Sequence, residues 1–86
     1  MNLLKKYTVT DNGNDFKFET RQEAIDFANK RFIMHKNTIK SINQKAKLAE
    51  PDFKVLKCHN ECKQTVIMTD KISKIHFEIT VKEPIA

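Results

Sequence analysis

The sequence predicts a small α+β domain with the order ββαβββ, in which a largely antiparallel sheet carries one long or broken helix on one face. Three observations lead to this prediction. Apolar residues alternate around an Asn-Gly pair near the start, they recur every three or four residues in the middle, and alternation returns after Pro51. Because 86 residues suffice for only one core, we expect a single domain over residues 1–86.

The first element is a β-hairpin over residues 5–19. Apolar and polar residues alternate on both sides of a short polar stretch, and the alternating apolar residues are Tyr7, Val9, Phe16 and Phe18. Between them, Asn12-Gly13 suits the positive backbone φ angles that a two-residue hairpin turn requires. Asp11 and Asp15 flank this turn, and we attribute them to turn chemistry rather than to a metal-binding pair of acids.

The second element is a helix over residues 21–49. Thr20 and Glu23 have the spacing of a capping box, in which each side chain bonds to the backbone amide of the other residue. Spacings of three and four then place one stripe of residues on a helix: Ile25, Ala28, Phe32, His35, Ile39, Ile42, Ala46 and Ala49. Pro51 favours an end just before it. His35 is the one polar member, and we expect a hydrogen-bonded core or seam histidine rather than a catalytic base.

Three strands follow within residues 53–82. We expect them at Phe53–His59, Lys63–Thr69 and Lys74–Lys82, because the apolar period changes from three or four to two after Pro51. The last strand has the clearest alternation, and its apolar residues are Ile75, Phe77, Ile79 and Val81. One face of this strand should therefore be buried and the other exposed to water.

The helix is too long for the sheet that these strands predict. A helix of 29 residues is about 43 Å long, whereas five strands side by side span about 24 Å. Either the helix breaks near residues 36–38, or its second half projects beyond the sheet. A projecting half would expose an apolar seam of Ile39, Ile42 and Ala46, and a homodimer through residues 36–49 is one way to cover it.

Basic charge is concentrated in the middle of the chain. The net charge is +5, and residues 27–57 contain eight basic and only two acidic side chains. Within this block, Lys36, Lys40, Asn43 and Lys47 are spaced four, three and four apart, so they line one helical face. This face is either a ridge that contacts the phosphates of a nucleic acid or another partner, or a solvated lysine-rich helix surface.

Cys58, His59 and Cys62 form the one cluster with metal-ligand chemistry. If His59, Asn60 and Glu61 make a three-residue loop, the two thiols face each other across its neck and are close enough for a shared Zn²⁺ or a disulfide. A structural zinc site needs four ligands, however, and the usual pair of CxxC motifs is absent. We therefore favour ordinary half-buried cysteines and expect no bound metal.

The residue pattern does not indicate an enzyme. A single glycine excludes the glycine-rich turns of dinucleotide- and phosphate-binding enzymes. Adjacent residues on a strand point to opposite faces, so Cys58 and His59 cannot form a nucleophile and base pair. The apolar runs are too short to cross a membrane, and Met1–Lys6 lacks the apolar core of a signal peptide. We expect a soluble, cytoplasmic, non-enzymatic protein without a cofactor.

Two kinds of partner fit these observations. The first is nucleic acid, which the lysine-rich helix would contact, as in a small accessory or regulatory protein of a phage or mobile element. The second is a host protein or nucleoprotein, which an inhibitor or adaptor would block by protein contact. An anti-CRISPR type of anti-defence protein, acting through the seam or an exposed sheet edge, is an example of the second kind.

Overall fold

A computed structural model describes residues 6–84 of the chain. Residues 1–5 and 85–86 lie outside this description. The first residue of the expected hairpin, Lys5, is therefore not described, and of the segment Met1–Lys6, in which a signal peptide was sought, only Lys6 is described. Within residues 6–84, no helix is both long enough and apolar enough to cross a membrane.

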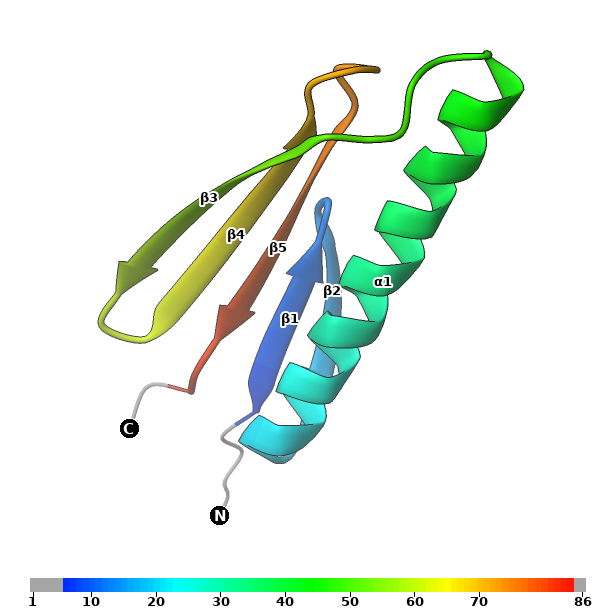
Figure 1. The fold of residues 1–86 in the computed structure, drawn as a ribbon. Coiled ribbons are helices and arrows are strands. Elements are labelled where there is room, and N and C mark those ends of the chain that lie inside the picture. Colours follow the sequence, from blue (N-terminus) through cyan, green and yellow to red (C-terminus); the bar gives the residue numbers. More distant parts are fainter. Residues whose placement is uncertain (1–5, 85–86) are drawn as a thin grey trace.

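The predicted order of elements, ββαβββ, is confirmed, and the protein is a small α+β domain (Figure 1). The elements are β1 (Tyr7–Asp11), β2 (Asn14–Phe18), α1 (Arg21–Lys45), β3 (Phe53–Asn60), β4 (Lys63–Asp70) and β5 (His76–Lys82). The five strands form one antiparallel sheet in the order β2-β1-β5-β4-β3. The last strand in the sequence is therefore the middle strand of the sheet.

The N-terminal hairpin and the start of the helix have the local geometry that their residues predict. Asn12 and Gly13 have φ angles of 48° and 90°, as a two-residue turn of this kind requires. Thr20 and Glu23 form the capping box, with the Glu23 amide donating to Thr20 Oγ1 over 3.2 Å and the Thr20 amide donating to Glu23 Oε1 over 3.1 Å. These short-range bonds fix where β2 ends and α1 begins.

The helix is continuous, so of the two alternatives the break near residues 36–38 is excluded; the helix ends at Lys45, so the predicted extent to residue 49 is wrong. The end is a Schellman motif: the Lys47 amide donates to the Gln44 carbonyl and the Leu48 amide to the Asn43 carbonyl. Lys47 adopts the left-handed conformation, with φ 59°, that glycine usually supplies at this position. Because a lysine occupies this position, the sequence has no glycine that would indicate the end of the helix.

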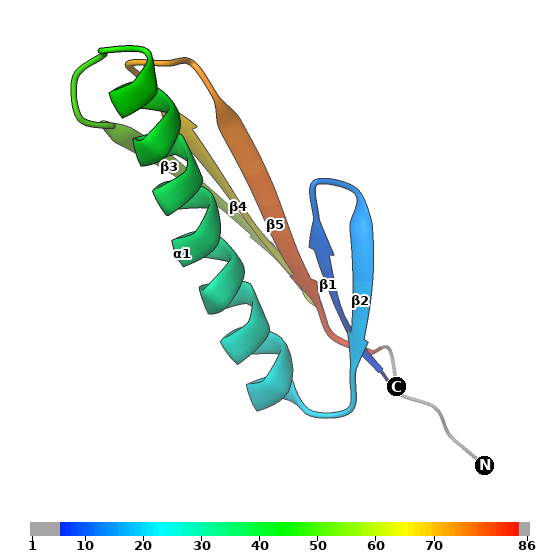
Figure 2. The same ribbon diagram turned by 90° about the vertical axis from the view of Figure 1, so that its right-hand side faces the viewer.

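The core lies between α1 and one face of the sheet, and α1 contacts β1, β2 and β5 (Figure 2). The buried apolar residues are Val9, Ala24, Ala28, Ile39, Met68, Phe77 and Ile79. Ile39 is only 3% exposed, so the prediction that it needs a partner from outside the chain is wrong. The helix runs past the tip of the β1–β2 hairpin (Figure 1). Ile42, in the last turn of α1, is 41% exposed.

The C-terminal strands differ from their predicted bounds by small shifts. β3 and β4 each extend one residue further than predicted, and Asn60 pairs with Lys63 around a two-residue turn. β5 begins at His76 rather than at Lys74, because Lys74 has a φ of 67° and belongs to the turn after β4.

Candidate binding groove

One helix covers only part of this five-stranded sheet. A helix with its side chains is about 10–12 Å wide, whereas the sheet is about 24 Å wide. Because α1 lies over β1, β2 and β5, the face of β3 and β4 on the same side of the sheet has no helix above it within residues 6–84. Figure 1 shows this half of the sheet extending away from α1.

A groove of about 510 Å³ therefore runs between α1 and the β3–β4 hairpin, and we call it the basic groove. Its apolar lining from α1 is Ile25, Ala28, Phe32 and Ile33, and its apolar lining from the sheet is Val55, Val66, Met68, Ile79 and Val81. Ile33 is 59% exposed and Val55 is 44% exposed, so the upper walls of the groove are apolar but open to water.

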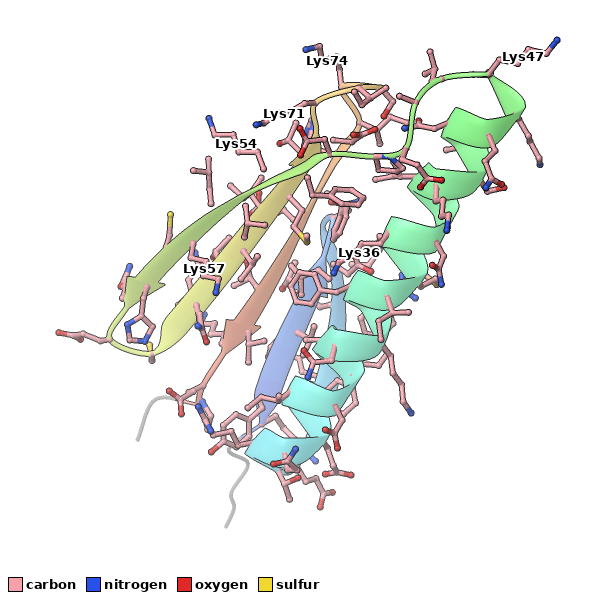
Figure 3. All side chains as sticks on the ribbon, viewed as in Figure 1. Lys36, Lys47, Lys54, Lys57, Lys71 and Lys74 are labelled. Atoms are coloured by element: carbon pink, nitrogen blue, oxygen red, sulfur yellow. The ribbon has the colours of Figure 1, made fainter. Side chains whose placement is uncertain are left out.

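Two lysines face each other across the groove. Asp11, Ile79, Val66 and Lys57 form one row across β1, β5, β4 and β3. His35, which precedes Lys36 on α1, bonds to Asp11 at the other end of this row. Lys36 and Lys57 therefore lie at the same position along the strands, on opposite sides of the groove. Figure 3 shows Lys36 extending from α1 toward the sheet and Lys57 lying over the β3–β4 hairpin.

Positive charge lies at the level of Lys36 and Lys57 and at the end of the groove near the start of α1. The groove lining contains Lys36 and Lys57 but no acidic residue. At the end near the start of α1 it adjoins a smaller hollow lined by Arg21, His59 and Lys63, among others. The one acidic side chain of that hollow, Glu83, lies 3.8 Å from the Arg21 guanidinium and is partly neutralised by it. The basic groove is thus suited to an apolar ligand that also has negative charge.

The predicted ridge of Lys36, Lys40, Asn43 and Lys47 does not form one exposed helical face. Lys36 and Lys40 are exposed on α1, whereas Asn43 is 1% exposed and Lys47 lies beyond the end of the helix. Of the predicted seam, Ile39 is in the core, and Ile42 and Ala46 remain exposed.

Asn43 instead joins the end of α1 to the turn after β4. Its Nδ2 donates to Asp70 Oδ2 over 2.8 Å, and the Asp70 carboxylate also accepts from the Ser73 hydroxyl over 2.7 Å and from three backbone amides. Burial raises the pKa of Asp70, but the hydrogen bonds from Ser73, Asn43 and the backbone amides outweigh burial and hold that pKa well below its usual value. This polar cluster anchors the second half of the helix.

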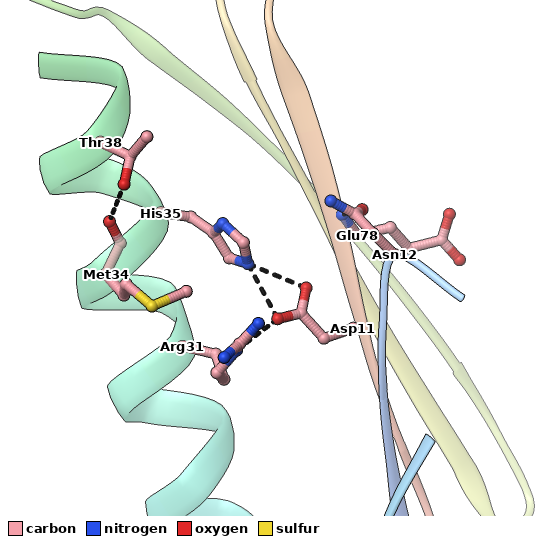
Figure 4. Close-up of polar contacts among 7 residues, drawn as sticks. All are labelled: Asp11, Asn12, Arg31, Met34, His35, Thr38 and Glu78. Carbon is pink, nitrogen blue, oxygen red and sulfur yellow. Dashed lines mark hydrogen bonds and ion pairs between the residues drawn. The ribbon is translucent and has the colours of Figure 1, made fainter. Parts of the chain in front are cut away.

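A second polar cluster joins the middle of α1 to β1 (Figure 4). The buried Asp11 carboxylate accepts from Arg31 Nε and lies 2.9 Å from His35 Nε2. The His35 ring also packs on Phe77, with centroids 4.6 Å apart. The expectation of a hydrogen-bonded core histidine is confirmed, but the Asp11 side chain faces the helix rather than serving the turn. Within residues 6–84, His35 bonds to Asp11 and to no hydroxyl or thiol.

The two cysteines do not face each other. Cys58 pairs with Thr65, whereas Cys62 lies in the two-residue turn, so the expected three-residue loop between them is wrong. Both thiols are free. Within residues 6–84, no group of three His, Cys, Asp or Glu side chains is placed to hold a metal ion, and Cys58, Cys62 and His59 therefore do not form the zinc site considered from the sequence.

Sequence reasoning did not find the basic groove. Lys57 and Val55 stand on a predicted strand and Ile33 on a predicted helix, but their meeting depends on which strands the helix covers. That arrangement follows from the pairing of β1 with β5, which alternation within single strands does not reveal. The available signal was the excess of basic over acidic residues between 27 and 57.

Comparisons of the chain with protein-family models, with curated proteins and with solved structures find no match in any of the three. The basic groove is therefore the feature from which a function is inferred.

Proposed function

We propose that this protein is a non-enzymatic binding module, an adaptor or inhibitor, that captures another protein in the basic groove. The observation that carries this proposal is the uncovered apolar face of β3 and β4 beside α1, with Ile33 and Val55 exposed in its walls. Apolar side chains kept at the surface in a contiguous patch are typical of protein–protein contact sites. The open shape favours a protein segment over a small molecule, because small-ligand sites enclose most of their ligand.

The groove fits a protein better than a nucleic acid. Phosphates are bound by lysines and backbone amides and gain nothing from a floor of Val66, Met68 and Ile79. Single-stranded bases stack on aromatic rings, and Phe32 is the one aromatic residue in the lining. Lys36 and Lys57 then act by attracting acidic side chains of the partner.

Site-directed photo-cross-linking in the cells that encode the protein tests this proposal. Val55 and Leu56 are a matched pair, because they are neighbours on β3 with similar exposures, 44% and 51%, and point to opposite faces of the sheet. A cross-linker at position 55 should give a protease-sensitive, nuclease-resistant product, and one at position 56 should not. Equal products at both positions, or products lost after nuclease treatment, would contradict capture in the groove.

Nucleic-acid binding is a second candidate, and an observation on the other face of the sheet favours it. Lys63 on β4 lies directly opposite Lys82 on β5, and Lys17 continues this row through Thr8. Like charges placed directly opposite on a sheet are destabilising. Within residues 6–84, no acidic side chain forms an ion pair with Lys63 or Lys82. A phosphate backbone along this face would relieve the repulsion.

Salt-dependent binding to a DNA duplex tests the second candidate. Replacing Lys63 and Lys82 with Gln should flatten the slope of log affinity against log salt by about 2, because two phosphate contacts are lost. The matched control replaces Lys36 and Lys40, and it should leave the slope unchanged if the sheet face is the site. Absence of duplex and single-strand binding by the wild type at low salt would remove this candidate.

A further inference from the structure

The basic groove has the dimensions of a missing helix. α1 takes up the half of the sheet over β1, β2 and β5, and the width left over β4 and β3 is close to the diameter of one more helix. Two helices packed side by side on a five-stranded sheet complete a two-layer domain. The α1 lining of the groove runs from Ile25 to Lys36, which corresponds to about three helical turns.

The flank of α1 above the groove has the residue spacing of a helix–helix contact. Asn29, Ile33, Lys36 and Lys40 are spaced four, three and four apart, so they form one row along the helix. All four are exposed. This row is the surface that a neighbouring helix at the usual 8–10 Å separation would contact.

The charges select what kind of helix fits. Lys36 on α1 and Lys57 on β3 line the space, and the groove lining contains no acidic residue. Lys40 is exposed about one turn further along the same row of α1. A second copy of α1 is a poor occupant because the exposed part of α1 is itself rich in lysine, with Lys30, Lys36, Lys40 and Lys45. A helix with an apolar stripe and acidic flanks would cover Val55, Val66 and Met68 and neutralise the lysines.

We propose that the basic groove binds an acidic amphipathic helix of a partner protein, which lies beside α1 as the second helix of the layer. This inference rests on the proposed function and names the chemistry of the partner element. Apolar contact with the sheet supplies most of the affinity, and the lysines distinguish acidic from basic helices.

The experiment uses three synthetic peptides of about 18 residues, a length at which an isolated helix begins to be stable. The first has leucines spaced three and four apart with glutamates on both flanks, and the second has lysines in place of the glutamates. The third has the acidic composition with two internal prolines, which prevent a helix. Each is titrated into the full-length protein at low salt, with affinity and backbone chemical shifts as readouts.

The acidic helical peptide should bind about tenfold more tightly than the basic one, as two exposed ion pairs predict. Its shifts should concentrate at Val55, Val66 and Ile33 and spare Leu56. In the doubly substituted variant Lys36→Glu/Lys57→Glu, the preference should reverse toward the basic peptide. Both substitutions are at exposed positions, so the fold should persist, and an unchanged amide spectrum outside the groove checks this.

Four outcomes would contradict the inference or the function on which it rests. Equal binding of acidic and basic peptides would remove the charge selection, and equal binding of the proline peptide would show that the groove does not require a helix. If the acidic helical peptide does not bind but position 55 still cross-links to a protein, the partner element is not an acidic helix, and the proposed capture of a protein in the groove is retained. Loss of the position-55 cross-link would reject the proposed function itself.

Discussion

Asp11 lies at the point where the middle of α1 meets the sheet, and its carboxylate is 1% exposed. Arg31 and His35 bond to it from successive turns of the helix, and the Arg31 guanidinium also lies 5.6 Å from the centre of the Phe16 ring. A buried ion pair of this kind adds little net stability compared with apolar residues, but removing one partner leaves the other charge uncompensated. Asp11 therefore fixes the position of the helix along the hairpin.

Replacing Asp11 with Ala should lower the free energy of unfolding by about 3 kcal/mol, because Arg31 loses the carboxylate that compensates its charge and His35 loses its hydrogen-bond partner. Urea denaturation measures the loss. The matched control is Asp15→Ala on the adjacent strand: Asp15 is exposed and accepts one hydrogen bond from Thr10, so the loss should stay below about 1 kcal/mol. Equal losses in both variants would contradict the role given to Asp11.

Asp70 makes the stability of the fold depend on pH in a defined direction. Its hydrogen bonds hold its pKa in the folded protein below the value of about 3.9 in an unfolded chain. Its contribution to stability is therefore fully present above about pH 4 and is lost as the pH falls below that value. Urea denaturation of wild type and Asp70→Asn at pH 7 and at pH 3 should show a smaller drop in the variant. An equal drop in both proteins would assign the acid sensitivity to other carboxylates.

The helix ends on a residue that is poorly suited to its backbone angle. Lys47 occupies the left-handed position of the Schellman motif, which costs a residue with a side chain about 1 kcal/mol relative to glycine. Lys47→Gly should therefore raise the free energy of unfolding by about 0.5–1 kcal/mol. Lys45→Gly, two residues earlier and within the helix, should lower it by up to about 1 kcal/mol. If the free energy of unfolding changes in the same direction in both variants, Lys47 is not the left-handed residue that ends the helix.

Residues whose structure is set by near neighbours could be predicted, and residues set by distant partners could not. The Asn12-Gly13 turn and the Thr20 capping box follow from a few adjacent residues, and both are present. Asn43 looked like part of an exposed ridge because its partner, Asp70, is 27 residues away. The helix length was overestimated for a different reason. The bonds that end the helix are local, but Lys47 occupies the left-handed position at which a glycine would have indicated the end.

The candidate site was only partly accessible to sequence analysis. Lys36 and Lys40 were found from their spacing and are exposed, whereas Lys57 was assigned only to a strand. Whether Lys57 faces α1 depends on the register of β3 against β4 and on the place of that hairpin in the sheet. A shift of one residue in that register would have turned Lys57 to the opposite face and Leu56 into the groove.

At the scale of the whole molecule, the uneven cover of the sheet affects how the protein associates with itself. The exposed part of the predicted seam is reduced to Ile42 and Ala46, because Ile39 is buried in the chain's own core. The net charge of +5 and the lysines around the basic groove also repel a second copy at low salt. A homodimer that covers the seam would therefore gain little free energy.

We predict a monomer in sedimentation experiments at tens of micromolar and low salt. Raising the salt concentration screens the repulsion between like charges, so any self-association should strengthen with salt. Binding of an acidic helix should weaken over the same range, and the opposite trends separate the two interactions. A dimer at low salt that is abolished by Ile42→Asp would restore the seam as an interface.

Because β5 is the middle strand of the sheet and the last strand in the sequence, the sheet can be completed only at the end of synthesis. The β1–β2 hairpin with α1 is made first and the β3–β4 hairpin second, but only β5 pairs with both, through β1 on one side and β4 on the other. Until residues through Lys82 have left the ribosome, neither half has the strand that joins it to the other, and Val9 and Met68 lack their partners on β5, Val81 and Phe77. A chain that ends before His76 would therefore contain two hairpins with no strand pairing between them, and such a chain is a substrate for chaperones or proteases.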